Sequence, residues 1–105
     1  MSYHLTPKAR ADISAGYEWI DRDNPDAAEA FLEAVKHTCE RLAQFPEFGA
    51  LACFKAKRLE GVRFTTAQPP FQKWIVFYRP SGAHVEVGRV IYGSMNWRHE
   101  PRRFF

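Results

Sequence analysis

Residues 74–92 read WIVFYRPSGAHVEVGRVIY, and this stretch decides the fold. Lys73 to Arg79 is dense in aromatic and β-branched residues, which is typical of a strand. The segment from Pro80 to Ala83 predicts a turn, and Val85 to Tyr92 predicts the last strand. A further strand is expected to open at Leu59 to Phe64. Together these segments predict a three-stranded antiparallel meander in the second half of the chain.

The first half predicts a short strand followed by two helices. Tyr3 to Leu5 alternates in polarity. Thr6 and Pro7 then follow in the order that is typical of a helix start, with a capping residue before a proline in the first helical position. Asn24 repeats this signal before Pro25, so the first helix should end near Asp23 and the second should begin at Pro25. The sequence therefore predicts a helical hairpin.

Each expected helix carries one apolar face, whose residues recur at helical spacing. The first face consists of Ala9, Ile13, Gly16, Tyr17 and Ile20, with Asp12 among the polar residues elsewhere. The second consists of Ala28, Phe31, Leu32, Val35, Cys39 and Leu42. Both faces should pack on one side of the sheet, which makes the fold class α+β.

The composition is that of a folded chain, because 46% of its 105 residues are hydrophobic and 15% are aromatic. This length predicts a single domain over residues 1–105. Residues 93–105 mix basic and aromatic residues without periodicity. We expect them to form a terminal arm that either docks on a partner or tucks its aromatic side chains over the core.

Several classes of protein and site are disfavoured by the sequence. No apolar run, Trp74 to Tyr78 included, is long enough to cross a membrane, and the N-terminus lacks the apolar centre of a signal peptide. We therefore expect a cytoplasmic protein. Cys39 and Cys53 should be free thiols, with Cys39 in the core. The four histidines lie far apart, so neither a metal site nor a cofactor is expected.

Charge is divided unevenly along the chain. Residues 1–50 hold five basic and nine acidic residues, a net of −4, whereas residues 51–105 hold ten and three, a net of +7. This asymmetry favours a positive surface that binds an acidic partner, either protein or nucleic acid. The alternative is that the acidic half neutralises the basic half within the fold.

The residue types needed for metal-independent RNA cleavage are present, but no catalytic residue is assigned. Such cleavage requires a base, an acid and cations beside the developing phosphorane charge. The candidates are Lys55, Lys57, Arg63, Arg79, Arg89, Tyr92 and His99. The alternative interpretation is that these residues are solvated or form salt bridges, as in any basic protein.

Several strings in the chain together carry a resemblance to a known family. They are Leu5-Thr6-Pro7-Lys8-Ala9, Asn24-Pro25-Asp26-Ala27-Ala28, Cys39-Glu40-Arg41-Leu42, Leu59-Glu60-Gly61-Val62-Arg63, Trp74-Ile75-Val76-Phe77-Tyr78-Arg79 and Val85-Glu86-Val87-Gly88-Arg89-Val90-Ile91-Tyr92-Gly93. In order and spacing, over roughly residues 3–93, they resemble the ParE/RelE superfamily of type II toxins, and the ParE branch most. After the last strand, however, residues 92–96 differ from the His-Gly-Ala-Arg-Asp-like ending that is usual in ParE proteins.

The resemblance implies a toxin that forms a hetero-oligomer with a cognate, ParD-like antitoxin. The C-terminal segment of such an antitoxin wraps over the helices and the sheet of the toxin. ParE-like members act on DNA gyrase without cutting RNA, which makes a non-enzymatic gyrase inhibitor the favoured function. RelE-like members cleave ribosome-bound mRNA, which is the alternative. An inert remnant or a structural binding module is a third interpretation.

Partner binding is predicted in the basic half of the chain. The residues expected to take part are Arg63, Arg79, Arg89, Tyr92 and Arg98. A guanidinium group holds a carboxylate bidentately, so antitoxin carboxylates should meet the arginines of the sheet. Whether Arg79 and Arg89 share a face depends on the register set by the turn between their strands.

Overall fold

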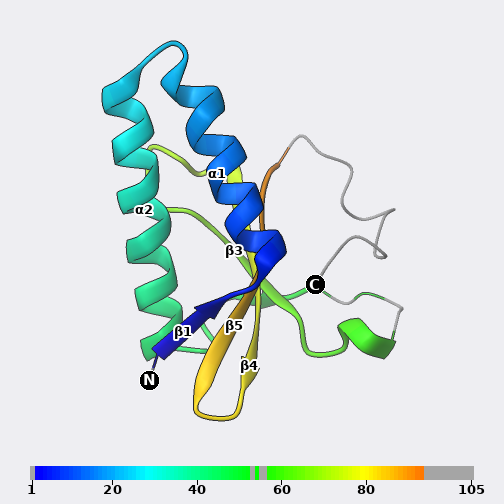
Figure 1. The fold of residues 1–105 in the computed structure, drawn as a ribbon. Coiled ribbons are helices and arrows are strands. Elements are labelled where there is room, and N and C mark those ends of the chain that lie inside the picture. Colours follow the sequence, from blue (N-terminus) through cyan, green and yellow to red (C-terminus); the bar gives the residue numbers. More distant parts are fainter. Residues whose placement is uncertain (1, 53, 55–56, 94–105) are drawn as a thin grey trace.

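The computed structural model describes residues 2–52, 54 and 57–93, and its elements follow the expected order of a strand, two helices and further strands (Figure 1). The two helices and the first strands are β1 (Ser2–Leu5), α1 (Pro7–Asp21), α2 (Pro25–Gln44) and β2 (Ala50–Leu51). They are followed by the 3-10 helix η1 (Lys57–Leu59), β3 (Arg63–Thr66), β4 (Trp74–Ser81) and β5 (His84–Tyr92). The class is α+β, as predicted.

The sheet is larger than the predicted meander. It contains five strands in the order β1-β5-β4-β3-β2. The predicted meander β3-β4-β5 is antiparallel, and β1 joins it by pairing with β5 in parallel. The two-residue strand β2 pairs with β3 and was not predicted, because two residues are too few to show a period. The N-terminal strand thus belongs to the same sheet as the C-terminal half.

The hairpin between β4 and β5 is tighter than predicted. Its loop consists of Gly82 and Ala83 alone, and Gly82 has a φ of 62°, a left-handed conformation that glycine adopts without steric cost. Pro80 lies inside β4 rather than in the turn. It is tolerated there because β4 pairs with β3 only as far as Tyr78, so Pro80 has a neighbouring strand on one side only.

Both helices begin where the cap and proline signals placed them. The Thr6 side chain accepts a hydrogen bond from the Ala9 N–H group at 3.1 Å, and Asn24 accepts one from the Ala27 N–H group at 3.1 Å. These side chains satisfy donors that the helices leave without partners. The first helix ends at Asp21, two residues before the predicted boundary at Asp23.

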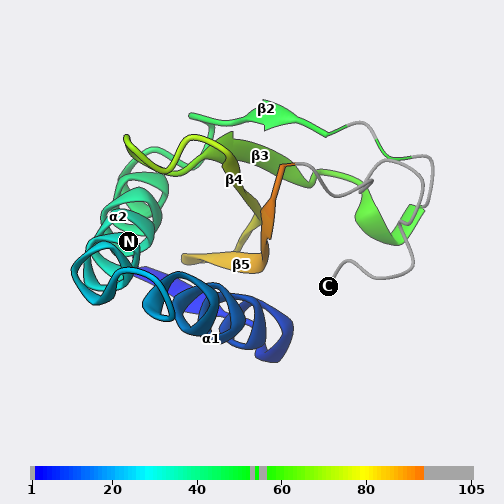
Figure 2. The ribbon, with the colours of Figure 1, turned by 90° about the horizontal axis from the view of Figure 1, so that it is seen from above.

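The helices cover one face of the sheet, as Figure 2 shows from above. The main core lies between them and contains Phe31, Val35, Cys39, Leu42, Trp74, Val76, Tyr78, Val85, Val87 and Val90. Tyr17 was wrongly placed on the face that packs on the sheet. It lies instead between the helices, where its hydroxyl donates a 2.9 Å hydrogen bond to Glu29.

A second core cluster covers the opposite face of the sheet and was not predicted. It contains Leu59, Val62, Phe77 and Ile91, with Phe54, Phe64 and Ile75 packed against it. The strand predicted to open at Leu59 opens instead at Arg63, because Leu59 ends η1 and Gly61 turns the chain at a φ of 83°. We refer to this side as the outer face and to the other as the helix face.

Among the described residues, neither helix is both long enough and apolar enough to cross a membrane.

Candidate partner-binding surfaces

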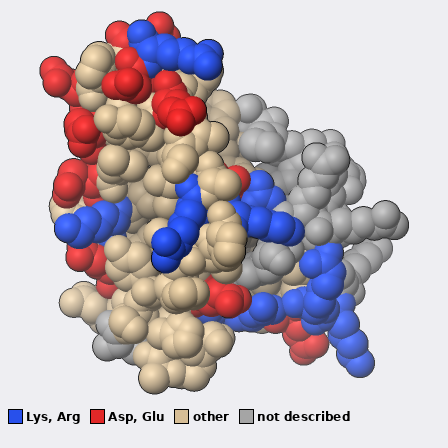
Figure 3. All heavy atoms as spheres, viewed as in Figure 1, with Lys and Arg blue, Asp and Glu red and all other residues tan. Residues whose placement is uncertain are grey.

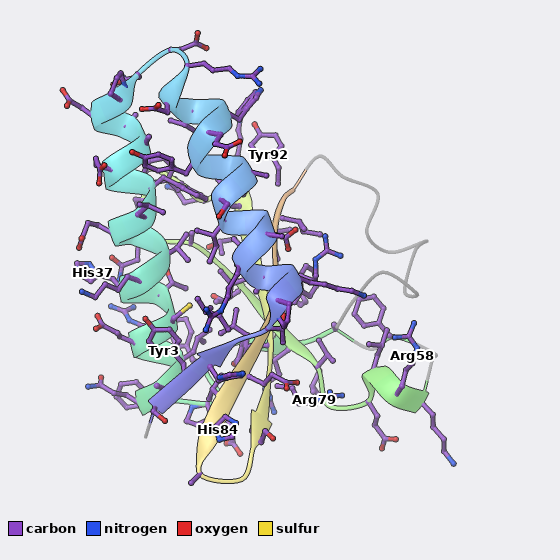
Figure 4. All side chains as sticks on the ribbon, in the orientation of Figure 1. Tyr3, His37, Arg58, Arg79, His84 and Tyr92 are labelled. Carbon is purple, nitrogen blue, oxygen red and sulfur yellow. The ribbon has the colours of Figure 1, made fainter. Side chains whose placement is uncertain are left out.

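Arg79 lies near the turn of the hairpin, on the outer face of the sheet. One guanidinium nitrogen, Nη1, donates to the Arg58 carbonyl oxygen at 2.8 Å, and Nη2 lies 3.5 Å from a carboxylate oxygen of Glu86 on β5. The Arg79 side chain is 31% exposed. Figure 4 shows Arg79 and Arg58 in the same lower part of the molecule. Arg79 can therefore meet a partner without leaving its place in the sheet.

Arg89 is held by α1 far more tightly. Its Nε and Nη2 atoms donate to the two carboxylate oxygens of Asp12 at 2.7 and 3.0 Å, and the Val90 N–H group donates to Asp12 at 3.0 Å. The Arg89 and Asp12 side chains are only 15% and 16% exposed. Asp12, which was expected among the polar residues outside the apolar face, thus joins α1 to β5 through its carboxylate.

A β-bulge decides which face Arg89 occupies. Tyr78 pairs with Val87, but Phe77 pairs with Arg89, so Gly88 is an extra residue in β5. The extra residue places Arg89 opposite Phe77 on the outer face, which Arg79 also occupies, since side chains alternate along a strand. The Arg89 guanidinium then reaches Asp12 around the edge of β5.

Arg63 lies on the helix face, separated from the other two arginines by the sheet. It pairs with Tyr78 across β3 and β4 and donates to the Gly49 carbonyl oxygen at 2.7 Å. The Tyr78 hydroxyl donates to the Pro46 carbonyl oxygen and accepts from the Gly49 N–H group, both at 2.8 Å. Burial raises the pKa of Tyr78 above its usual value. These two side chains fix the turn that follows α2, and this turn exposes Phe48.

Tyr92 ends β5 within a cluster of aromatic rings beside α1. Its ring centroid lies 5.4 Å from that of Trp74 and 6.3 Å from that of Trp19. Trp19 is 61% exposed, which is unusual for so large an apolar side chain. Figure 4 shows Tyr92 at the end of the sheet opposite Arg79.

A groove of about 450 Å³ opens beside this aromatic cluster, between α1 and the end of β5. Its lining is mostly apolar and is formed by Asp12, Ala15, Gly16, Trp19, Trp74, Val90, Ile91 and Tyr92. We call it the α1–β5 groove. Sequence reasoning assigned Gly16 to the apolar face but missed Trp19, which follows Ala15 by one helical turn and so lies on the same side of α1.

The five predicted binding residues do not form one surface. Arg79 and Arg89 share the outer face, Arg63 and Tyr92 lie on the helix face, and Arg98 lies outside the described residues. Figure 3 shows acidic side chains along the outer edge of the helices, with basic side chains over the centre and lower right of that view. Basic side chains also lie at the top and the left of that view, so the two signs of charge are only partly separated on the face that it shows.

The remaining chemistry of the described residues is sparse. No group of three or more histidine, cysteine, aspartate or glutamate residues is arranged to hold a metal ion within residues 2–52, 54 and 57–93. Cys39 is buried as predicted, and burial raises the pKa of its thiol to about 12, which keeps it protonated and unreactive near neutral pH.

These observations define the class of the protein: a small α+β protein with a helical hairpin on a mixed five-stranded sheet. The model of the family described as "ParE toxin of type II toxin-antitoxin system, parDE" matches residues 3–97, so the chain belongs to this family. A solved structure entitled "Chromosomal ParDE TA system from P. aeruginosa" is similar in fold, with a TM-score of 0.70 and 24% sequence identity. The match covers 88% of this chain and 95% of that one. No curated protein gave a significant match.

Proposed function

We propose that this protein arrests growth by binding DNA gyrase in the cytoplasm, without cutting RNA, and that a cognate antitoxin neutralises it in a hetero-oligomeric complex. The observation that carries the proposal is the match of the ParE family model to residues 3–97. Neutralisation follows the ParDE pairing that the family description and the similar solved structure both name.

The placement of the candidate RNA-cleaving residues favours binding over cleavage. Catalysis of phosphodiester cleavage requires acid, base and cations within hydrogen-bond reach of one phosphate. Arg79 and Tyr92 lie on opposite faces and at opposite ends of the sheet. Arg89 already holds the Asp12 carboxylate, and Arg63 holds the turn after α2. These four residues therefore support a ribonuclease poorly, whereas the candidates Lys55 and His99 lie outside the described residues.

Among the predicted contact residues, Arg79 is the best supported as a site for antitoxin carboxylates. It is twice as exposed as Arg89, and its contact with Glu86 is long enough to be exchanged for a closer carboxylate. Tyr92 offers an aromatic contact on the other side of the sheet. The contacts of Arg89 and Arg63 serve mainly to stabilise the fold.

Two assays on the purified toxin test this proposal side by side. The first measures supercoiling of relaxed plasmid by gyrase with increasing toxin, and the second measures cleavage of mRNA on programmed ribosomes. We expect loss of supercoiling with intact mRNA. Codon-specific cuts in the mRNA with normal supercoiling would assign the protein to the ribonuclease mechanism instead. Adding the antitoxin to the toxin before gyrase should restore supercoiling.

A further inference from the structure

Two histidines lie side by side at the edge of the sheet, near the turn of the hairpin. His4 belongs to β1 and His84 begins β5, and their ring centroids lie 6.1 Å apart in an edge-to-face arrangement. The two are far apart in the sequence, so their spacing along the chain predicted no shared site. The parallel pairing of β1 with β5 brings them together.

Both histidine side chains lie on the outer face of the sheet. Tyr3 and Leu5, on either side of His4, pack against the main core, so His4 points the other way. Val85, which follows His84, belongs to the same core, so His84 also points to the outer face. Figure 4 shows His84 close to the turn of the hairpin. His4 is exposed and His84 is only half-buried, so a solute can reach both rings.

The pairing of the strands fixes the distance between the two histidines. Ser2 lies opposite His84 and His4 lies opposite Glu86, so the histidines are diagonal neighbours on adjacent strands. On its other side β5 is held by β4, where Ser81 lies opposite His84. A backbone that is already in place lowers the entropic cost of bringing two side chains to one ligand.

The separation of the two rings suits two ligands of one metal ion. Two imidazoles on a tetrahedral zinc ion hold their ring centres roughly 5 to 6 Å apart, because each Zn–N bond is about 2.0 to 2.1 Å long. The 6.1 Å between His4 and His84 is close to this separation. Rotation of the side chains can therefore aim one nitrogen of each ring at a common point, without a change in the strands.

The surrounding charges and the ligand type indicate which ions fit. Glu86 brings a carboxylate to the same face, and Arg79, 3.5 Å from it, offsets part of its charge. No third histidine, cysteine, aspartate or glutamate of the described residues is arranged to complete a metal site. Imidazole ligands suit zinc, copper and nickel, whereas magnesium and calcium prefer oxygen ligands.

We propose that His4 and His84 together bind one divalent transition-metal ion of the zinc class, with water at the remaining coordination positions. The bound ion ties the N-terminal strand to the hairpin and so fixes the strand from which α1 begins. Because the two ligands come together only in the folded chain, binding of the ion stabilises the folded state. This site depends on neither the gyrase target nor the antitoxin.

Calorimetric titration of the untagged, full-length protein with zinc chloride tests the site, with magnesium chloride as the control ion. The variants are His4→Ala, His84→Ala and the double variant. One control is His37→Ala, which removes an exposed histidine of α2 whose Nε2 atom lies 3.7 Å from a Glu33 carboxylate oxygen. The other is His99→Ala, at a position outside the described residues. Thermal melts check that each variant is folded.

We expect one zinc ion per chain and binding at least about tenfold weaker in each single variant. The double variant should lose little more, because the loss of either ligand already breaks the chelate. Both controls should stay within about twofold of the wild type. At a zinc concentration about 100-fold above Kd, the midpoint of thermal unfolding should rise by at least about 5 °C in the wild type but not in His84→Ala.

Three results would overturn the proposal: no zinc binding by the wild type, wild-type affinity in either folded single variant, or equal affinity for magnesium. A tenfold loss in His37→Ala or His99→Ala would assign the ion to another histidine and would also overturn it. All of these measurements use the toxin alone, so their outcome is independent of whether the protein inhibits gyrase.

Discussion

Arg89 and Arg79 lie on the same face of one hairpin, yet their surroundings give them different tasks. Arg89 makes two hydrogen bonds to Asp12 and is 15% exposed, whereas Arg79 meets Glu86 at 3.5 Å and is 31% exposed. Arg89 meets a carboxylate that α1 contributes, whereas Arg79 meets one from the neighbouring strand β5. The comparison shows that the neighbouring element, rather than the residue type or the face, decides whether a cation is structural.

The largest effect is expected when Asp12 is removed. Asp12→Ala leaves the Arg89 guanidinium and the Val90 N–H group without their partner in a largely buried place, and it should lower the free energy of unfolding by about 3 kcal/mol. Glu18→Ala, at an exposed position of the same helix, is the control and should change it by less than about 0.5 kcal/mol. Chemical denaturation measures both. A loss below about 1 kcal/mol for Asp12→Ala would mean that the ion pair contributes little.

The converse change, Arg89→Ala, should cost less than Asp12→Ala. Asp12 would keep the hydrogen bond from the Val90 N–H group and could draw water to its free oxygen. We therefore expect a loss of about 2 kcal/mol in the free energy of unfolding. Equal losses for the two variants would show that the backbone hydrogen bond adds nothing to the ion pair.

The turn after α2 offers a second test of a side chain that serves the fold. Tyr78→Phe removes the hydroxyl that binds Pro46 and Gly49, and the loss should be about 1 to 2 kcal/mol. The raised pKa of Tyr78 adds a pH signature. The unfolded phenol ionises near its usual value of 10 and the folded one only at higher pH, so stability present below pH 10 is lost above it. Denaturation curves at pH 8 and about pH 10.5 should show a smaller pH effect in Tyr78→Phe than in the wild type.

The smallest effect on stability is expected at Arg79. Its ion pair with Glu86 is long and about one third exposed, so solvent screens most of its energy. Arg79→Ala should change the free energy of unfolding by less than about 1 kcal/mol, although the hydrogen bond to Arg58 is also lost. A cost equal to that of Arg89→Ala would remove the distinction between the two arginines.

The fold was predictable wherever the sequence is periodic. The caps at Thr6 and Asn24 and the apolar face of the second helix were correct, because they depend on local chemistry and on spacing. The second core was missed because the residues that supply it before β3, among them Phe54, Leu59 and Val62, recur without a regular period. The extent of the sheet was also missed, since the parallel pairing of β1 with β5 joins residues more than 80 positions apart.

The binding surface was less predictable than the fold. The sequence shows the residue types. The bulge at Gly88, however, decides which face Arg89 occupies, and one carboxylate on α1 decides whether Arg89 is available to a partner. Neither feature has a local signature. Asp12 has the sequence pattern of a solvated helix residue and differs only in what the tertiary structure places beside it. Trp19 was missed because one exposed aromatic residue in a helix shows nothing of the groove next to it.

The central claim is that Arg79 contacts the antitoxin while Arg89 stabilises the fold. Its most direct test is calorimetric titration of Arg79→Ala and Arg89→Ala with the antitoxin at two salt concentrations. We expect Arg79→Ala to weaken binding by about tenfold at low salt and by less at high salt, because a partly exposed ion pair is screened. Folded Arg89→Ala should stay within about twofold of the wild type. Unchanged affinity in Arg79→Ala, or a larger loss in folded Arg89→Ala, would contradict the account.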